Sequence, residues 1–461
     1  MDDLFPVEPV QPPSPGRRRL LVVMTVIVLA AFVVVAGLGG SGFIIRSDAG
    51  PATRATDAPQ ARARLVYVGA DGTLNVFDAG PTVHYPAPGA TFDFPAWSPD
   101  RTRIAVIRHE PDGTSLDVYT PPPPGGGHQD DVTPPTVVYR SLQEPPFYAY
   151  WAPDGSSLAF LTTEPDGIAL RRVPADASQP ATTVRRGAPM YWQWVDPARL
   201  LVHSGGEAAD AFAGEVGLDG AALGSVAVQP GAFRVPAISA DGKDVAFTTL
   251  GADRTRSMVV ASADGSQRHD VTVYTLAAFA FDPAGDSLAF VAGATAGEAT
   301  DFPIGPLRVM DPATGDVRTL VDGDVVIFFW SPDGRTIAAI EIPGLGGTTT
   351  ASGSGEPAIL ARAELGGVRA AATPSLPLFF VDVATGAIRS KQAVHLSDLF
   401  VGQVLPYFDQ YALSHRFWSP DSRSLVLPII SAQGVSRIAS FFADGSDPVD
   451  LVDGQFASWS P

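Results

Sequence analysis

The chain has 461 residues, with 31 Lys and Arg against 49 Asp and Glu, a formal net charge of −18, and no cysteine. The lack of cysteine excludes disulfides, cysteine nucleophiles and thiolate metal sites. Because so acidic a chain repels phosphate backbones, the sequence predicts that nucleic acid is not a partner.

The first 38 residues read as a membrane anchor. Residues 1–19 are predicted to be a proline-rich cytoplasmic tail that ends in Arg17-Arg18-Arg19. The run 20–38 contains no charged residue, and as a helix it reaches roughly 28 Å, close to the thickness of a bilayer core. Arginines before it favour a cytoplasmic N-terminus. We expect one transmembrane signal anchor over 20–38. A cleaved signal peptide is the alternative, and both readings export the rest of the chain.

The segment after the anchor changes character. Residues 39–63 are rich in Gly, Ala and Pro and are predicted to be a flexible linker. Two short apolar runs follow at 65–68 and 73–77, joined by a Gly-Ala-Asp-Gly turn at 69–72. They predict two strands of a sheet, and no tryptophan-containing strand precedes them.

A strand–turn–strand unit recurs from there to the end of the chain. Its clearest copy is Trp330-Ser331-Pro332-Asp333-Gly334, between apolar runs at 327–330 and 337–340. The proline presets φ for an early turn position, the aspartate accepts backbone hydrogen bonds, and the glycine supplies a positive φ. The unit contains one such aspartate per copy. Calcium needs six to eight oxygen ligands at one point, so we predict turn-capping rather than calcium binding.

Further copies of the unit are spread along the chain at 94–100, 150–155, 194–197, 238–242, 281–285, 417–421 and 456–461. Successive turn positions are 41 to 54 residues apart, except for one step of 88 that contains an insertion. This period, with about four short strands per repeat, is typical of a β-propeller blade. We predict an all-β, eight-bladed propeller, or seven blades if the degenerate unit near 190–230 does not form. Pairing of 456–461 with the strand at 65–68 is predicted to close the ring.

The Trp-Ser-Pro-Asp-Gly copies, together with hairpins such as Ala263-Asp264-Gly265 and Ala443-Asp444-Gly445, resemble TolB-like, WD40-like propeller repeats. The resemblance covers residues 64–461. It implies the fold, but such propellers serve as scaffolds, binding modules and accessory domains, so it implies no single activity. The chain also resembles the propeller of prolyl-oligopeptidase-like enzymes, whose α/β-hydrolase domain has no room here.

Long loops point to one face of the propeller. Four excursions are predicted to share the face opposite the Pro-Asp-Gly turns: 141–147, 292–303, 343–374 and 396–411. Aromatic and cationic residues that begin first strands near the channel mouth on this face are the candidate ligand-binding residues: Tyr148, Tyr191, Trp192, His415 and Arg416. Core packing is the alternative for the Tyr and Trp residues.

No catalytic motif accompanies these residues. The chain has no G-x-S-x-G elbow, no P-loop and no metalloprotease spacing among its seven His, so no catalytic residue, metal ligand or cofactor is predicted. Residues 1–64 hold seven Arg and five acidic residues, which leaves 24 basic and 44 acidic residues in the rest, a net charge of −20. We predict a membrane-anchored extracytoplasmic β-propeller that is a binding or scaffolding module for a protein or cell-envelope ligand. The alternative is a propeller hydrolase or lyase acting on a carbohydrate or lactone at the channel mouth.

Overall fold

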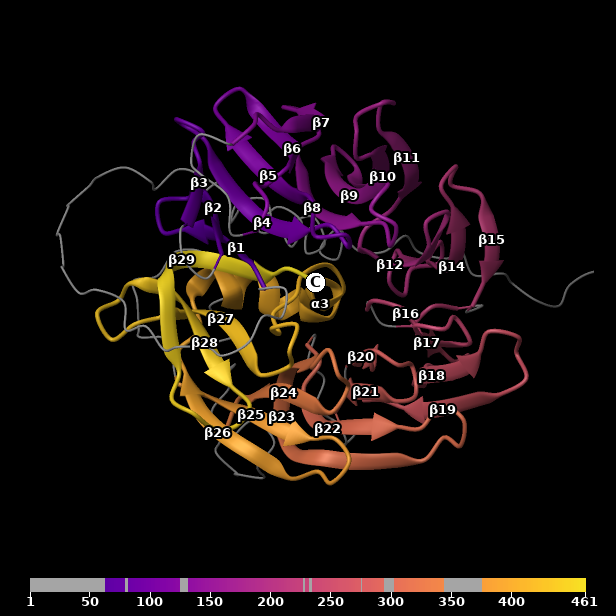
Figure 1. The fold of residues 1–461 in the computed structure, drawn as a ribbon. Coiled ribbons are helices and arrows are strands. Elements are labelled where there is room, and N and C mark those ends of the chain that lie inside the picture. Colours follow the sequence, from indigo (N-terminus) through magenta and orange to yellow (C-terminus); the bar gives the residue numbers. More distant parts are fainter. Residues whose placement is uncertain are drawn as a thin grey trace, which may run out of the picture.

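Antiparallel sheets arranged around a central axis make up the structure, a computed structural model (Figure 1). It describes residues 63–78, 82–124, 132–226, 229–231, 234–274, 276–293, 302–343 and 375–461. The predicted all-β class and propeller architecture are confirmed. The predicted tail, the anchor at 20–38 and nearly all of the linker at 39–63 lie outside the described residues. None of the helices in the described ranges has both the length and the apolar composition that a bilayer-spanning helix needs.

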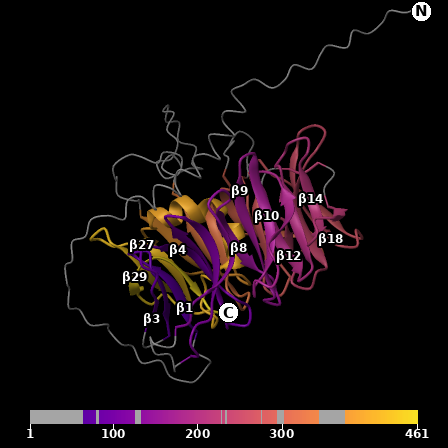
Figure 2. The ribbon, with the colours of Figure 1, turned by 90° about the horizontal axis from the view of Figure 1, so that it is seen from above.

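Four of the sheets contain four strands each, and these sheets succeed one another around the axis (Figures 1 and 2). The first contains β4 (Thr91–Trp97), β5 (Ile104–Glu110), β6 (Gly113–Tyr119) and β7 (Thr136–Ser141). The second contains β8 (Pro146–Trp151), β9 (Ser157–Glu164), β10 (Gly167–Pro174) and β11 (Thr182–Arg186). The third contains β12 (Met190–Asp196), β13 (Arg199–Ser204), β14 (Phe212–Gly217) and β15 (Ala222–Ser225). The fourth contains β16 (Ala237–Ile238), β17 (Asp244–Leu250), β18 (Arg256–Ser262) and β19 (Arg268–Thr272).

A seven-stranded sheet follows, and one strand joins its two parts. It contains β20 (Ala278–Phe281), β21 (Leu288–Val291), β22 (Gly305–Met310), β23 (Val317–Trp330), β24 (Thr336–Glu341), β25 (Leu376–Asp382) and β26 (Ile388–Val394). The first half of β23 pairs with β22 and its second half pairs with β24. The predicted insertion at 343–374 falls between β24 and β25, and nearly all of it lies outside the described residues.

The six-stranded sheet joins the two ends of the described chain. It contains β27 (Ser424–Ile430), β28 (Ser436–Phe442), β29 (Val449–Trp459), β1 (Leu65–Gly69), β2 (Leu74–Phe77) and β3 (Thr82–Tyr85). The first half of β29 pairs with β28. Its second half pairs with β1, with Leu65 opposite Trp459 and Val66 opposite Ser458. The predicted pairing of the chain ends is therefore present, and it leaves neither of these strands as an open edge.

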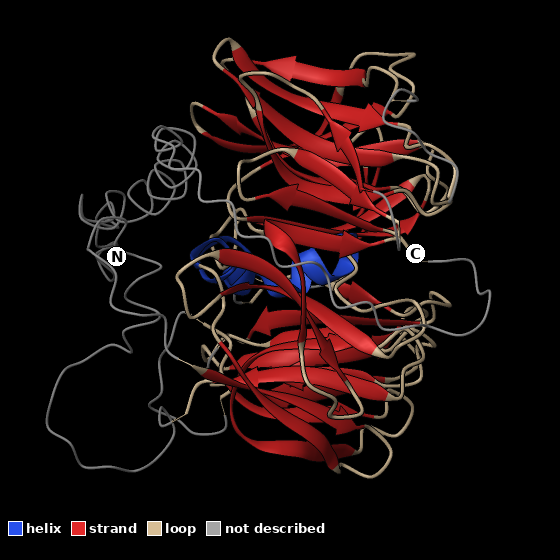
Figure 3. Ribbon diagram, turned by 60° about the vertical axis from the view of Figure 1, so that its left-hand side comes forward, coloured by secondary structure: helices blue, strands red, loops and turns tan. Residues whose placement is uncertain are grey.

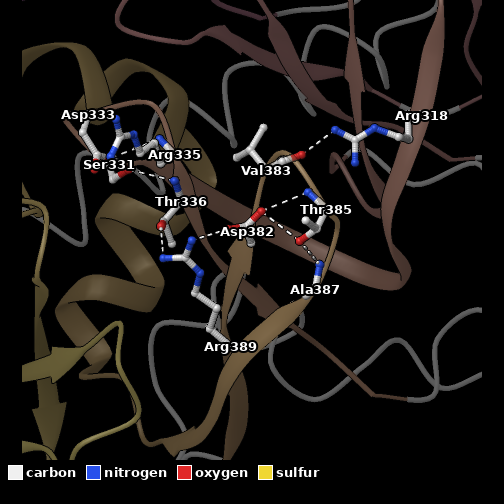
Figure 4. A network of polar contacts seen from close by, with 10 residues as sticks. All are labelled: Arg318, Ser331, Asp333, Arg335, Thr336, Asp382, Val383, Thr385, Ala387 and Arg389. Atoms are coloured by element: carbon white, nitrogen blue, oxygen red, sulfur yellow. Dashed lines mark hydrogen bonds and ion pairs between the residues drawn. The ribbon is translucent and has the colours of Figure 1, made fainter.

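Each Pro-Asp-Gly turn is held by its own side chains. The Ser331 hydroxyl donates to Asp333 Oδ1 (2.6 Å) and accepts the Thr336 N–H (3.0 Å), and Asp333 Oδ1 also accepts the Arg335 N–H (3.0 Å) (Figure 4). Gly334 has a φ of 67°. The same bond from a turn aspartate to the N–H two residues on is made by Asp100, Asp154, Asp241 and Asp421. The predicted turn-capping role is confirmed.

The turn of an outer hairpin is also held by an aspartate side chain. Between β25 and β26, Asp382 Oδ1 accepts the N–H (2.9 Å) and the hydroxyl (2.8 Å) of Thr385, and Arg389 pairs with the same carboxylate (Figure 4). The backbone hydrogen bond from Thr385, followed by the Arg389 contact, lowers the pKa of Asp382 to about 2. The Asp382 carboxylate therefore stabilises the turn between β25 and β26.

Several of the repeated tryptophans tie their inner strand to the inner strand before it. Trp330 Nε1 donates to the carbonyl of Ala280 on β20 (3.1 Å), and Trp418 Nε1 donates to Phe329 on β23 (3.0 Å). Trp151 Nε1 donates in the same way to Ala96 on β4 (3.0 Å). These bonds satisfy indole N–H donors that burial would otherwise leave unpaired.

Candidate functional site

A helical segment fills the centre of the ring. It consists of a π-helix, η2 (Phe400–Val404), a 3₁₀ turn, η3 (Leu405–Tyr407), and α3 (Phe408–Ser414). The helix α3 contacts the inner strands β8, β12, β20 and β23, and Figures 1 and 3 place it between the sheets. We call η2, η3 and α3 together the plug (residues 400–414). The sequence correctly predicted 396–411 as a connection between propeller repeats, but the prediction that it is a surface excursion is wrong, because its apolar residues are buried on the axis.

Buried polar contacts anchor the plug to the ring. Gln410 Nε2 donates to the Trp192 carbonyl (2.8 Å), and its Oε1 accepts the Trp192 N–H (3.0 Å). Arg234 Nη1 lies 3.2 Å from Asp409 Oδ1 and also donates to the carbonyl of Pro406 (3.1 Å). Both side chains of this ion pair are only 2% exposed. Burial raises the pKa of Asp409, and the charge of Arg234 opposes that shift.

Four of the five predicted ligand-binding residues are buried. The Tyr148 hydroxyl lies 2.6 Å from Ser414 Oγ and 2.9 Å from the Gln410 carbonyl. Trp192 makes the backbone contacts to Gln410, and the Tyr191 ring centroid lies 6.3 Å from that of Tyr407. These three residues therefore contact the plug. Ligand binding by them stays a prediction.

His415 and Arg416 follow directly after the plug. His415 Nε2 lies 3.1 Å from the Phe94 carbonyl and Nδ1 lies 2.7 Å from Ser414 Oγ. Burial lowers the pKa of His415 to about 4, so this imidazole is neutral at ordinary pH. Arg416 is exposed, unlike the other four.

A cavity of about 460 Å³ adjoins these two residues. Its walls include the ends of inner strands and the turns that follow them, such as Asp282, Pro283 and Pro332, and the last turn of α3. The cavity therefore opens among the Pro-Asp-Gly turns, on the face opposite the one on which the sequence predicted a ligand site. His415 and Arg416 line it, whereas Tyr148, Tyr191 and Trp192 do not.

The remaining walls of the cavity are mostly aromatic and apolar. The lining includes Tyr150, Phe281, Trp330 and Leu413, none of which is among the residues predicted from the sequence. A signal for three of them was present, since Tyr150, Phe281 and Trp330 each lie at or next to the end of an inner strand.

The cavity presents polar groups of both signs, but they differ in their surroundings. Asp282 accepts the backbone N–H of Ser287 (2.9 Å) within its own turn, and Asp409 pairs with Arg234. Although part of Arg416 is exposed, desolvation by the surrounding protein lowers its pKa. Desolvation raises the pKa of Tyr150, and the positive charge of Arg416 opposes that rise. Such a cavity, apolar with a few convergent polar groups, is typical of a small-molecule site.

Comparison with known proteins identifies the fold. No protein-family model and no curated protein sequence matches the chain. A dihydro-heme d1 dehydrogenase structure has a TM-score of 0.52 at 12% identity, covering 88% of this chain and 76% of that one. The fold is a β-propeller. TolB from Acinetobacter baumannii has a TM-score of 0.38 at 13% identity, over 88% of this chain and 81% of that one. An oligogalacturonate lyase has a TM-score of 0.43 at 10% identity, covering 86% of each chain.

TolB, whose repeats this chain resembles in sequence, is among these structures. The names of the neighbours include a lyase and a dehydrogenase as well as TolB. Because one fold hosts many activities, these likenesses do not separate a binding module from an enzyme.

Proposed function

We propose that this protein is a membrane-anchored, extracytoplasmic β-propeller that binds a ligand in the cavity on its turn side. The observation that carries the binding proposal is the cavity of about 460 Å³, walled by inner-strand ends and floored by the last turn of the plug. The turn residues in the cavity wall favour ligand entry from the turn side. The partner is a protein segment or a cell-envelope molecule small enough to enter.

Eight blades are part of this proposal. The four four-stranded sheets supply one blade each. The two larger sheets supply two each, since β23 and β29 are long enough to end one blade and begin the next. In the last blade, Trp418 occupies the inner position through its bridge to Leu425. The degenerate unit near 190–230 contributes the strands β12–β15, which favours eight over seven.

The membrane placement rests on the uncharged run 20–38 and the arginines at 17–19. The lack of natural cysteine makes a clean test available. A single cysteine in place of exposed Ala222, on outer strand β15, should react with a membrane-impermeant maleimide in intact cells. A cysteine in place of Ser14 should react only after lysis. Labelling of both sites in intact cells, or of neither, would refute the proposed orientation.

The contacts of the lining carboxylates favour binding over hydrolysis or elimination. A carbohydrate-active site of the usual kind needs two carboxylates available to the substrate. Of the cavity carboxylates, Asp282 is bonded within its turn and Asp409 is paired with Arg234. The cavity is therefore better suited to hold a ligand than to transfer protons to it.

The binding proposal is tested by ligand-observed NMR with a fragment library and the full chain purified in detergent. Ala412 is exposed, lies on α3 and lines the cavity, so Ala412→Trp should fill the space and abolish the binding of fragments that occupy it. Ala222→Trp introduces the same side chain on outer strand β15 and should leave binding unchanged. The proposal fails if no fragment binds, or if binding is the same in both variants.

A further inference from the structure

Arg416 stands out among the cavity residues. It is the residue that follows His415 at the end of the plug, it is exposed, and it lines the cavity. Among the residues that the structure describes, no carboxylate lies within ion-pairing distance of its guanidinium. By contrast, many described arginines elsewhere on the propeller are paired, as Arg199 is with Glu215 at 2.8 Å. An exposed arginine inside a cavity of an acidic protein is free to pair with an anion from solution.

The surroundings of Arg416 reinforce its positive character. The nearest carboxylates of the lining are engaged elsewhere, because Asp282 caps its turn and Asp409 is neutralised by Arg234. The charge of Arg101, on the exposed turn after β4, also acts on Arg416. Arg416 and Arg101 therefore place two positive charges near one another at the cavity, although residues 65–461 carry a net charge of −20. Neighbouring positive charges attract an anionic ligand.

A second donor lines the same cavity as the guanidinium. Tyr150 is half-buried at the end of β8 and lines the same cavity, close enough to Arg416 for the two groups to interact electrostatically. Its hydroxyl makes no hydrogen bond to any residue in the described part of the chain. A guanidinium with a neighbouring hydroxyl matches the two oxygens of a carboxylate, and charge-assisted bonds of this kind are the stronger ones in proteins.

The apolar part of the cavity defines the rest of the ligand. Phe281 and Trp330 are half-buried at the ends of their strands, and Leu413 contributes an aliphatic surface from the plug. Trp330 is held in place by its bond to Ala280. Flat aromatic walls prefer a ring that stacks on them or meets them edge to face. The volume of about 460 Å³ is at the lower end of small-molecule sites.

We propose that the cavity recognises an aromatic carboxylate, whose carboxylate binds Arg416 and the Tyr150 hydroxyl while its ring lies against Phe281 and Trp330. This inference rests on the proposed binding function and specifies its chemistry. A free aromatic acid and the C-terminal residue of a peptide present the same chemistry, so the test includes both sources.

The test compares matched ligands that differ only in charge. N-acetyltryptophan and N-acetyltryptophanamide are titrated by calorimetry against the full chain in detergent, beside Gly-Gly-Trp with a free or an amidated C-terminus. A hydrogen-bonded charge pair predicts that each acid binds tenfold or more tightly than its amide. Tighter binding of the peptide acid than of N-acetyltryptophan assigns the site to protein C-termini, and the reverse order assigns it to free acids.

Variants locate the effect. Arg416→Gln should abolish the preference for the acid, and Tyr150→Phe should reduce it. Arg335→Gln removes an exposed arginine on a Pro-Asp-Gly turn outside the cavity lining and should leave the preference intact. Circular dichroism and thermal melting verify that each variant is folded.

The outcomes separate this inference from the broader proposal. Equal binding of acid and amide, abolished by Ala412→Trp, overturns the carboxylate assignment but leaves the cavity as a binding site. A preference that persists in Arg416→Gln also overturns the assignment. Failure of both acids to bind overturns it as well, and only failure of the entire fragment library removes the proposed binding function.

Discussion

The buried ion pair between the ring and the plug makes a quantitative prediction. Arg234 Nη1 lies 3.2 Å and 3.4 Å from the two carboxylate oxygens of Asp409, and both side chains are 2% exposed. Replacing Asp409 by Leu leaves a buried guanidinium without its counter-charge. Breaking one partner of such a pair costs about 3–5 kcal/mol, so Asp409→Leu should lower the free energy of unfolding by this amount.

The double variant decides whether burial of charge is the cause. Arg234→Met combined with Asp409→Leu removes both charges and should recover most of the lost stability, because apolar residues replace a pair that was costly to desolvate. Equilibrium denaturation in urea, followed by tryptophan fluorescence, measures each variant of the full chain. Glu215→Leu breaks the partly exposed pair with Arg199 and should cost less than about 1 kcal/mol. A double variant as unstable as the sum of the single variants would refute the reasoning.

Three further predictions concern ring closure, pH and the tryptophan bonds. Phe456 is 1% exposed on the closing strand, so Phe456→Ala should lower the free energy of unfolding by about 3–5 kcal/mol in urea denaturation. Val449→Ala, on the exposed half of β29, should lower it much less. Equal losses in the two variants would contradict ring closure. His415 has a pKa of about 4 in the fold against about 6.5 unfolded, so the unfolded chain binds more protons in between. Stability should therefore fall by up to roughly 3 kcal/mol as the pH drops from 6.5 to 4, and a His415→Gln melting series should lack this fall. Trp330→Phe removes a hydrogen-bonded indole donor and should lower the free energy of unfolding in urea by about 1–3 kcal/mol. Trp459→Phe removes a buried donor for which no described residue is an acceptor, so its loss of stability should be smaller. The opposite order would contradict the proposed role of the tryptophan bonds.

Local chemistry explains why the fold was predictable from the sequence. Each Ser-Pro-Asp-Gly turn is specified by residues that bond to one another within five positions, as Ser331, Asp333 and Thr336 do. The apolar runs on both sides have the length of a strand, and the repeat period gives the number of strands per unit. The pairing of β29 with β1 was predictable because the first repeat lacks an inner strand and the last repeat consists of an inner strand alone.

The site depended on contacts that are distant in sequence. Nothing local distinguishes 396–411 from a surface loop, and it becomes a plug only because the inner strands leave an apolar axis that must be filled. Because the plug occupies the axis, Tyr148, Tyr191 and Trp192 are buried against it. The cavity lies on the turn side instead, where Arg416 lines it.

The sequence by itself therefore determined the repeat, the turns and the closure, because these depend on hydrogen bonds between near neighbours and on strand periodicity. Only the tertiary structure decided which face is hollow and which polar residues reach it. The reason is physical: burial depends on what packs across the axis, and here the Asp409–Arg234 and Gln410–Trp192 contacts join segments about 175 and 218 residues apart.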